Sequence, residues 1–198
     1  WRTAASCRRR ASSVSCAISR RARSWVHSSA RSGSVFASGI SGSGAMTKSG
    51  SGKLTLTGVN TYTGATLVSG GTLVIGHNNA LGDTAGSTTV ASGTSLELSD
   101  GLIVAENVTI AGSGVPGTAA FLVSSGAAAT HTGTLTLSSD SNISVNSGSL
   151  TLSGVINNTF TLTKNGTGVA NLSGANNFSG KTIVNGGSLL INGSIGDL

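Results

Sequence analysis

Cysteine, proline, aromatic and charged residues are all scarce in this chain, and each shortage narrows the possible folds. Its 198 residues include two cysteines and one proline, with 4% aromatic and 9% charged residues. So few large side chains cannot build one compact core, whereas stacked short strands can bury small aliphatic residues coil on coil. Both cysteines lie before residue 17. The remainder suits any redox compartment, as in many exported proteins. No apolar run is long enough to predict a membrane span.

The net positive charge of the chain comes entirely from its first 31 residues. Eight arginines there contribute +8, while the rest of the chain holds four lysines and six acids, or 4 − 6 = −2. Residues 1–34 also lack apolar alternation, so we expect a disordered arm, followed by a Gly/Ser-rich join over residues 35–52. The arm lacks the apolar core of a secretory signal. It fits a transit peptide, a nucleic-acid-binding segment or, as we favour, a stretch translated outside the native reading frame.

One unit of the sequence occurs twice. Residues 47–76 align without a gap to residues 163–192, and close to half of the positions are identical. Most of the identical residues are glycines and alternating aliphatic residues, which fix turns and strands, so the repeat encodes a backbone plan. A unit that recurs far along the chain indicates a solenoid rather than a sandwich. We therefore predict a β-solenoid over residues 53–198.

Short alternating runs separated by glycine turns predict strands, and no window has the periodicity of a helix. In such a run the residue between two inward aliphatic residues points outward, so Glu97, between Leu96 and Leu98, is expected to face solvent. The predicted strands cover residues 53–57, 66–68, 72–75, 88–90, 95–98, 103–104, 108–110, 120–123, 134–137, 143–145, 149–152, 160–162, 169–172, 182–184 and 188–191.

The repeated unit carries a recognisable pattern. Residues 52–64 read GKLTLTGVNTYTG, and the second copy keeps the pattern with Ala170 for leucine and Phe178 for tyrosine. This unit resembles the autotransporter-associated β-strand repeat of bacterial passenger regions, over residues 39–198. The resemblance implies an all-β, right-handed parallel β-helix on the bacterial surface, roughly 30–40 Å long at ~4.8 Å per coil. It also implies a longer parent chain with further coils and a C-terminal β-barrel, of which this sequence would be a fragment.

Candidate chemical motifs are weak. Residues 112–117 satisfy GxGxxG but lead into another strand without a helix to hold a phosphate, so they are read as a loop. His77 and His131 are expected to be solvated loop residues. Glu97 and Asp100 are the closest carboxylates and could form the acid pair of a glycoside hydrolase, although Asp100 has a turn signature. We predict no catalytic, cofactor-binding or metal-binding residue.

Asparagine and aromatic residues are assigned structural roles. Asparagines at turns can stack as amide ladders between coils, and the aromatic residues Tyr62 and Phe178 are expected to stack on or cover a coil edge. The members of the asparagine set are Asn60, Asn78, Asn79, Asn157, Asn158, Asn176 and Asn177.

The sequence thus predicts a non-enzymatic structural or interaction module, a stalk or adhesin segment exposed at the cell surface. Its expected partners are the other coils of the parent and a surface glycan or protein, without nucleic acid. The alternatives are a carbohydrate-active β-helix enzyme, which needs clustered charged residues on one face, and nucleic-acid binding through the basic arm.

Overall fold

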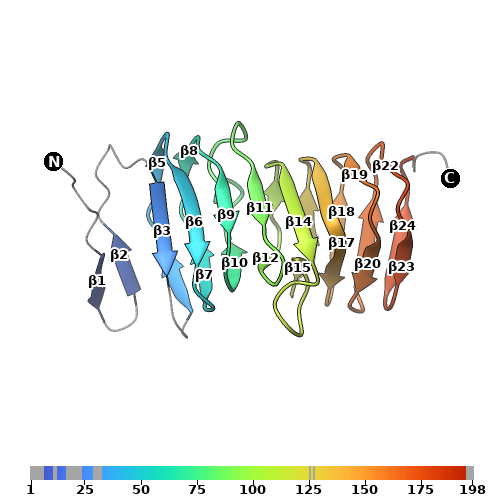
Figure 1. The fold of residues 1–198 in the computed structure, drawn as a ribbon, viewed down its shortest axis with the longest axis horizontal. Helices are drawn as coiled ribbons and strands as arrows, with labels where there is room; N and C mark the ends of the chain where they lie inside the picture. Colours follow the sequence, from blue (N-terminus) through green and yellow to red (C-terminus); the bar gives the residue numbers. More distant parts are fainter. Residues whose placement is uncertain are drawn as a thin grey trace.

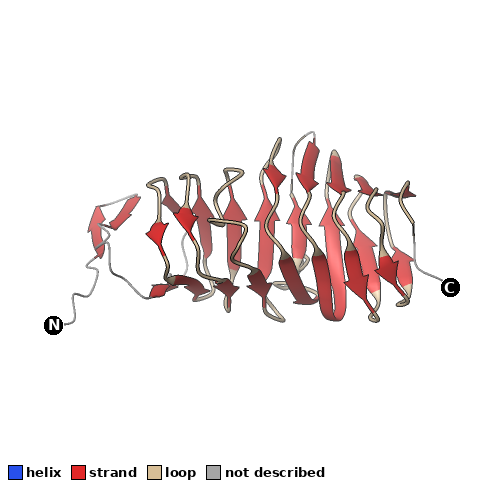
Figure 2. Cartoon of the chain, turned by 90° about the horizontal axis from the view of Figure 1, so that it is seen from above, coloured by secondary structure: helices blue, strands red, loops and turns tan. Residues whose placement is uncertain are grey.

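The computed structural model describes residues 7–10, 13–16, 24–28, 33–124, 126 and 128–194. Regular structure within these residues consists only of strands, which stack into a parallel β-solenoid of about seven turns. Figure 1 shows the coils following one another along the long axis, and Figure 2 shows the same coils from above, as strands joined by short turns. The predicted β-solenoid is confirmed.

Three faces make up each turn of the solenoid, and within each face the strands run parallel. The first face contains β3 (Ser24–Ser28), β6 (Ala45–Ser49), β9 (Thr66–Val68), β11 (Thr88–Val90), β14 (Val108–Gly112), the first half of β17 (Leu135–Val145), β19 (Ile156–Asn158) and β22 (Asn177–Phe178). The second face contains β4 (Ser34–Phe36), β7 (Lys53–Leu56), β10 (Thr72–Ile75), β12 (Ser95–Leu98), β15 (Phe121–Val123), the second half of β17, β20 (Leu162–Asn165) and β23 (Thr182–Val184).

The third face is interrupted by a turn. It contains β5 (Ser41–Gly42) and β8 (Thr61–Tyr62), then β13 (Ile103–Val104), β16 (Ala128–His131), β18 (Ser149–Leu152), β21 (Val169–Leu172) and β24 (Ser188–Ile191). Between these two groups the turn over residues 77–87 continues the stack, because Asp83 donates its main-chain N–H to Tyr62 and Asn78 accepts from the N–H of Ile103.

Alternation builds the core, as predicted. Inward residues of neighbouring coils stand in register, so Leu54, Leu73 and Leu96 form one column and Leu56, Ile75 and Leu98 form the next. All six are at most 4% exposed. Such columns bury small aliphatic side chains without any large central residue, which is how a chain poor in aromatics obtains a continuous apolar interior.

Two coils depart from the regular plan. In β17 the predicted strands 134–137 and 143–145 merge into one, because residues 138–142 contain no glycine to form a turn and the strand bends from the first face onto the second. In the preceding coil, residues 113–120 form an irregular loop between β14 and β15. The GxGxxG sequence begins at Gly112, the last residue of β14, continues into this loop and is followed by a strand, as expected.

Part of the N-terminal arm pairs with other strands. β1 (Cys7–Arg10) and β2 (Ser13–Cys16) form an antiparallel pair, and β3 pairs in parallel with β6. The remaining residues of the expected disordered arm lie outside the described part of the chain, as do the arginine side chains. No described segment forms a helix long and apolar enough to cross a membrane.

The two copies of the repeat lie on different faces of the solenoid. Lys48 is in register with Val68 on the first face. Lys164 lies on the second face, in register with Ile143. The column of register partners continues from Ile143 through the earlier coils and ends at Leu54; the intervening residues are Phe121, Leu96 and Leu73. The second copy is therefore displaced by five coils and rotated by one face, so the repeated unit does not mark one side of the solenoid.

Candidate functional site

The most distinctive side chains of the repeat are two buried lysines. Lys48 and Lys164 are both 0% exposed. The Nζ of Lys48 donates to the main-chain oxygens of Ser49, Gly50 and Gly70 at 3.1, 2.8 and 2.7 Å. An ammonium group has three donors, and here each of them finds a main-chain carbonyl acceptor at one corner.

Lys164 repeats this arrangement in the second copy. Its Nζ donates to the main-chain oxygens of Asn165, Gly166 and Gly186 at 2.8, 2.8 and 2.9 Å. We call each set of three oxygens a lysine cage. Burial lowers the pKa of both lysines below the ordinary value, since removal from water disfavours the charged form. The cage oxygens oppose that effect, because they accept hydrogen bonds from the ammonium group.

Two repeated glycines give each cage its shape. Gly50 and Gly166 have φ values of 78° and 79°, in the left-handed region that only glycine adopts without strain. Gly70 and Gly186 pass close to the preceding coil: a Cβ would lie 2.9 Å from the oxygen of Gly50 and 3.2 Å from that of Gly166. The repeated lysine and glycines therefore form one structural unit.

A buried asparagine connects coils at a second corner. Asn60 is 2% exposed; its Oδ1 accepts from the N–H of Ile40 at 2.8 Å and its Nδ2 donates to the oxygen of Ala80. It thereby joins the preceding and following coils. Asn176, 3% exposed, accepts from the N–H of Ile156 at 3.1 Å in the same way, but donates to Gly174.

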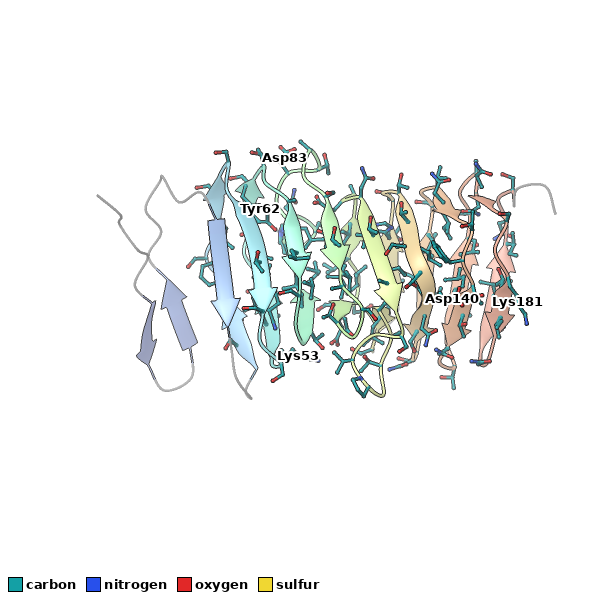
Figure 3. The ribbon with its side chains drawn as sticks, in the orientation of Figure 1. Lys53, Tyr62, Asp83, Asp140 and Lys181 are labelled. Atoms are coloured by element: carbon teal, nitrogen blue, oxygen red, sulfur yellow. The ribbon has the colours of Figure 1, made fainter. Side chains whose placement is uncertain are left out.

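Tyr62, Thr66, Thr88 and Glu106 form a third group of buried polar side chains, which we call the polar corner. The second copy of the repeat has phenylalanine in place of Tyr62. Tyr62 is 1% exposed, and its hydroxyl lies 2.6 Å from Thr66 Oγ1. Burial, the largest cause, raises the pKa of this phenol far above its ordinary value. Glu106, 3% exposed, has no hydrogen-bond partner for either carboxylate oxygen among the described residues, and the same is true of Thr88 Oγ1. In Figure 3, Asp83 lies at the rim of this part of the solenoid, with Tyr62 beneath it.

The expectation for His131 was wrong. This residue lies in β16, is 0% exposed and contacts Phe121 edge-on, with ring centroids 5.4 Å apart. Its Nε2 lies 2.7 Å from the main-chain oxygen of Glu106, and burial lowers the pKa of the imidazole. The alternation that points Ala129 inward also points His131 inward. His77 does lie in a turn, where its Nδ1 accepts from the N–H of Asn79.

The two candidate catalytic carboxylates are each bonded to different neighbours. Glu97 lies on the outer side of β12 as predicted, but it is only 7% exposed, because it pairs with Lys53 Nζ at 2.7 Å and accepts from Ser124 Oγ. Lys53 lies on β7, two coils away, so this ion pair crosses β10. Asp100 accepts from the N–H of Ala128 at 3.0 Å. Both carboxylates thus join coils to one another.

Of the predicted asparagines, Asn157 and Asn177 stand in register on neighbouring coils, whereas the amide hydrogen bonds between coils lie at other positions. Asn185 donates to Asn165 at 3.0 Å, and Asn192 donates to Asn171 at 3.0 Å, both on the outside of the solenoid. Tyr62 lies in the core rather than over a coil edge. The predictions for the side chains of Phe178 and Asn158 fall on side chains that the structure does not describe.

The inward orientation of Lys48, Lys164 and Glu106 was not predicted from the sequence, although their positions in alternating runs indicate it. Lys48 follows Met46 at i+2, Lys164 follows Leu162, and Glu106 stands between Val104 and Val108. Each charged residue therefore occupies the inward phase of its alternating run. Nowhere in the described part of the chain do three or more His, Cys, Asp or Glu side chains gather as metal ligands would.

The comparisons with known proteins concern the repeated unit. The model of the passenger-associated-transport-repeat matches residues 46–75 and 162–191, nearly the same ranges as the internal repeat. No curated protein and no solved structure matches the chain. The matched segments contain both lysine cages and both buried asparagines. Over these two segments the chain is therefore similar to the passenger-associated-transport-repeat, which is consistent with the repeat of an autotransporter passenger.

Proposed function

We propose that this segment is a rigid, non-enzymatic spacer in a surface-exposed autotransporter passenger, which holds another domain away from the cell. The observation that carries the proposal is that the buried polar side chains form hydrogen bonds between coils. Lys48, Asn60 and Glu97 each make at least one hydrogen bond to another coil, so these bonds stiffen the stack. Backbone pairing along each face supports the same role.

An adhesin that binds a surface glycan or protein through its outer faces is the second candidate. The first face favours it, because outward residues of successive coils, such as Thr89, Thr109 and Thr136, stand in register and carry no charge. Hydroxyl groups repeated at ~4.8 Å could bind a neutral partner. Binding of nucleic acid by the arginine-rich arm stays an alternative to the prediction, which expects no nucleic acid.

A replacement experiment in the parent protein separates these roles. Residues 45–194 are exchanged for an unrelated β-solenoid with the same number of coils, and surface display and adhesion of whole cells are measured. A spacer predicts that adhesion survives the exchange and falls when two coils are deleted. Loss of adhesion after exchange, with display unchanged, would contradict the spacer and support the adhesin.

A further inference from the structure

Glu106 occupies an unusual place for a carboxyl group. It lies two residues before the start of β14, in the inward phase that also buries Val104 and Val108, and 3% of its surface is exposed. The turn of the preceding coil lies against it, because a Cβ at Gly86 would stand 3.4 Å from Glu106 Oε1. Neither carboxylate oxygen has a hydrogen-bond partner within the described part of the chain.

Hydroxyl groups from the two preceding coils surround this position. Thr88 on β11 is the register partner of Val108, two residues after Glu106, and Thr66 on β9 is the register partner of Thr88. The Thr66 hydroxyl pairs with Tyr62, whereas Thr88 Oγ1 is buried without a partner in the described structure. The Thr88 hydroxyl lowers the pKa of Glu106, because a hydroxyl near the carboxylate favours its ionised form, but burial and Asp83 raise it by more.

The charged and titratable groups around Glu106 offer it no cation. Asp83, on the turn over residues 77–87, is exposed and raises the pKa of Glu106 by repulsion. Tyr62 is neutral because burial raises its pKa. His131 contacts the main-chain oxygen of Glu106 rather than its carboxyl group, and burial lowers the pKa of this imidazole. An ionised Glu106 would therefore face one negative charge, on Asp83, and two neutral titratable groups, Tyr62 and His131.

We propose that Glu106 is a proton-binding site that couples the packing of three consecutive coils to pH. In the neutral acid, the O–H of Glu106 donates to Thr88 Oγ1, so that both unpartnered groups gain a hydrogen bond. When the acid ionises, the proton leaves to solvent and a buried carboxylate remains, to which the single O–H of Thr88 can donate at one oxygen at most, so the charge stays poorly compensated and costs free energy. The coils carrying Tyr62, Thr88 and Glu106 are thus held more firmly in the protonated state. This role is additional to that of a spacer.

The direction and range of the pH effect follow from burial and from Asp83. Burial, the larger cause, and repulsion by Asp83 raise the pKa of Glu106 from 4.5 to about 7. The folded state therefore binds this proton more tightly than the unfolded state. Its stabilising contribution is complete below pH 4.5, declines as pH rises towards 7 and is lost above 7. Over that interval the folding equilibrium constant should change on the order of a hundredfold.

The test compares the full chain with Glu106→Gln by denaturant unfolding between pH 4 and 8.5. Glutamine imitates the neutral acid at every pH. We expect equal stability at the acidic end and a variant whose folding constant exceeds the wild-type value on the order of a hundredfold above pH 7. His131 is present in both proteins, so its own titration cancels in the difference. A difference that does not depend on pH would overturn the proposal.

Two further measurements remain decisive if Glu106→Gln does not fold. The carboxyl carbon of Glu106 is titrated by NMR in the wild-type chain, where a midpoint near the ordinary value of 4.5 would refute the proposal. Asp83→Asn removes an exposed charge and should lower that midpoint, whereas Asp140→Asn, an exposed acid on another corner, should leave it unchanged. If calcium at pH 8.5 restores the acidic stability, the ligand is a metal ion and the proton assignment is wrong.

Discussion

Lys48 and Lys164 bind equivalent cages of three main-chain oxygens, although the two lysines lie on adjacent faces of the solenoid. In each cage two oxygens belong to the residues directly after the lysine, and the third belongs to the glycine 22 residues further on. All of these residues lie within one copy of the repeat. The repeated unit therefore supplies its own connection between coils, independently of the face on which it lies.

Removing one ammonium group should destabilise the solenoid substantially. In Lys48→Met a side chain of similar length replaces the lysine, and the oxygens of Ser49, Gly50 and Gly70 lose their shared donor. Because buried acceptors without partners are costly, the free energy of unfolding should fall by about 2–4 kcal/mol. Chemical denaturation of the full chain measures this change.

Lys181→Met is the matched control for that substitution. Lys181 is an exposed lysine near the last described coils (Figure 3), so its loss should change the free energy of unfolding by less than about 0.5 kcal/mol. Lys164→Met should behave like Lys48→Met. Equal stability of the Lys48 and Lys181 variants would show that the cage adds nothing to folding.

The cages also predict which amines react. Lys53 and Lys181 are exposed and should be acylated rapidly by an amine-specific reagent, whereas Lys48 and Lys164 have no accessible surface. Their acylation should be limited by local opening of the coil. Peptide mass spectrometry after brief labelling separates the two classes, and denaturant should abolish the difference. Equal labelling in the native chain would place the two lysines outside their cages.

Alternation and glycine spacing predicted most of the fold because both signals are local. Runs such as residues 72–75 and 95–98 agree with β10 and β12 to the residue. Among the missed strands, β5 and β6 lie in the expected join over residues 35–52, and two others have weak local signals. β8 has two residues, and β16 begins with small residues that carry no strong preference. Such segments are strands because neighbouring coils offer paired backbone groups, which a single window of sequence does not reveal.

Charged residues were harder to place than strands. Glu97 is outward yet covered, because its partners Lys53 and Ser124 come from coils whose register the sequence does not specify. The rotation of the second repeat by one face could not be predicted from the sequence for a related reason. It depends on the summed lengths of five coils, and those lengths vary with each loop. Lys164 therefore could not be assigned to a face from its match to Lys48.

Removing the amide donor of Asn60 should lower the free energy of unfolding. In Asn60→Asp the side chain keeps its size and can still accept from Ile40, but nothing donates to the oxygen of Ala80 and a carboxylate is buried. A loss of about 3 kcal/mol is expected at neutral pH. Protonation restores a donor, so part of the loss should disappear as pH falls. Asn78→Asp is the control, because Asn78 is exposed and uses only its acceptor, towards Ile103.

Tyr62 offers a spectroscopic test of the polar corner, because it is the only tyrosine in the chain. Burial raises the pKa of its phenol, so the absorbance of phenolate should be absent at pH 11 in the folded protein and appear together with unfolding. Tyr62→Phe removes the hydrogen bond to Thr66 and should cost about 1 kcal/mol. Phenylalanine already occupies this slot in the second copy, as Phe178. The ring alone therefore suffices for the fold, and a cost well above this value would mean that the hydroxyl also supports Glu106 on the neighbouring coils.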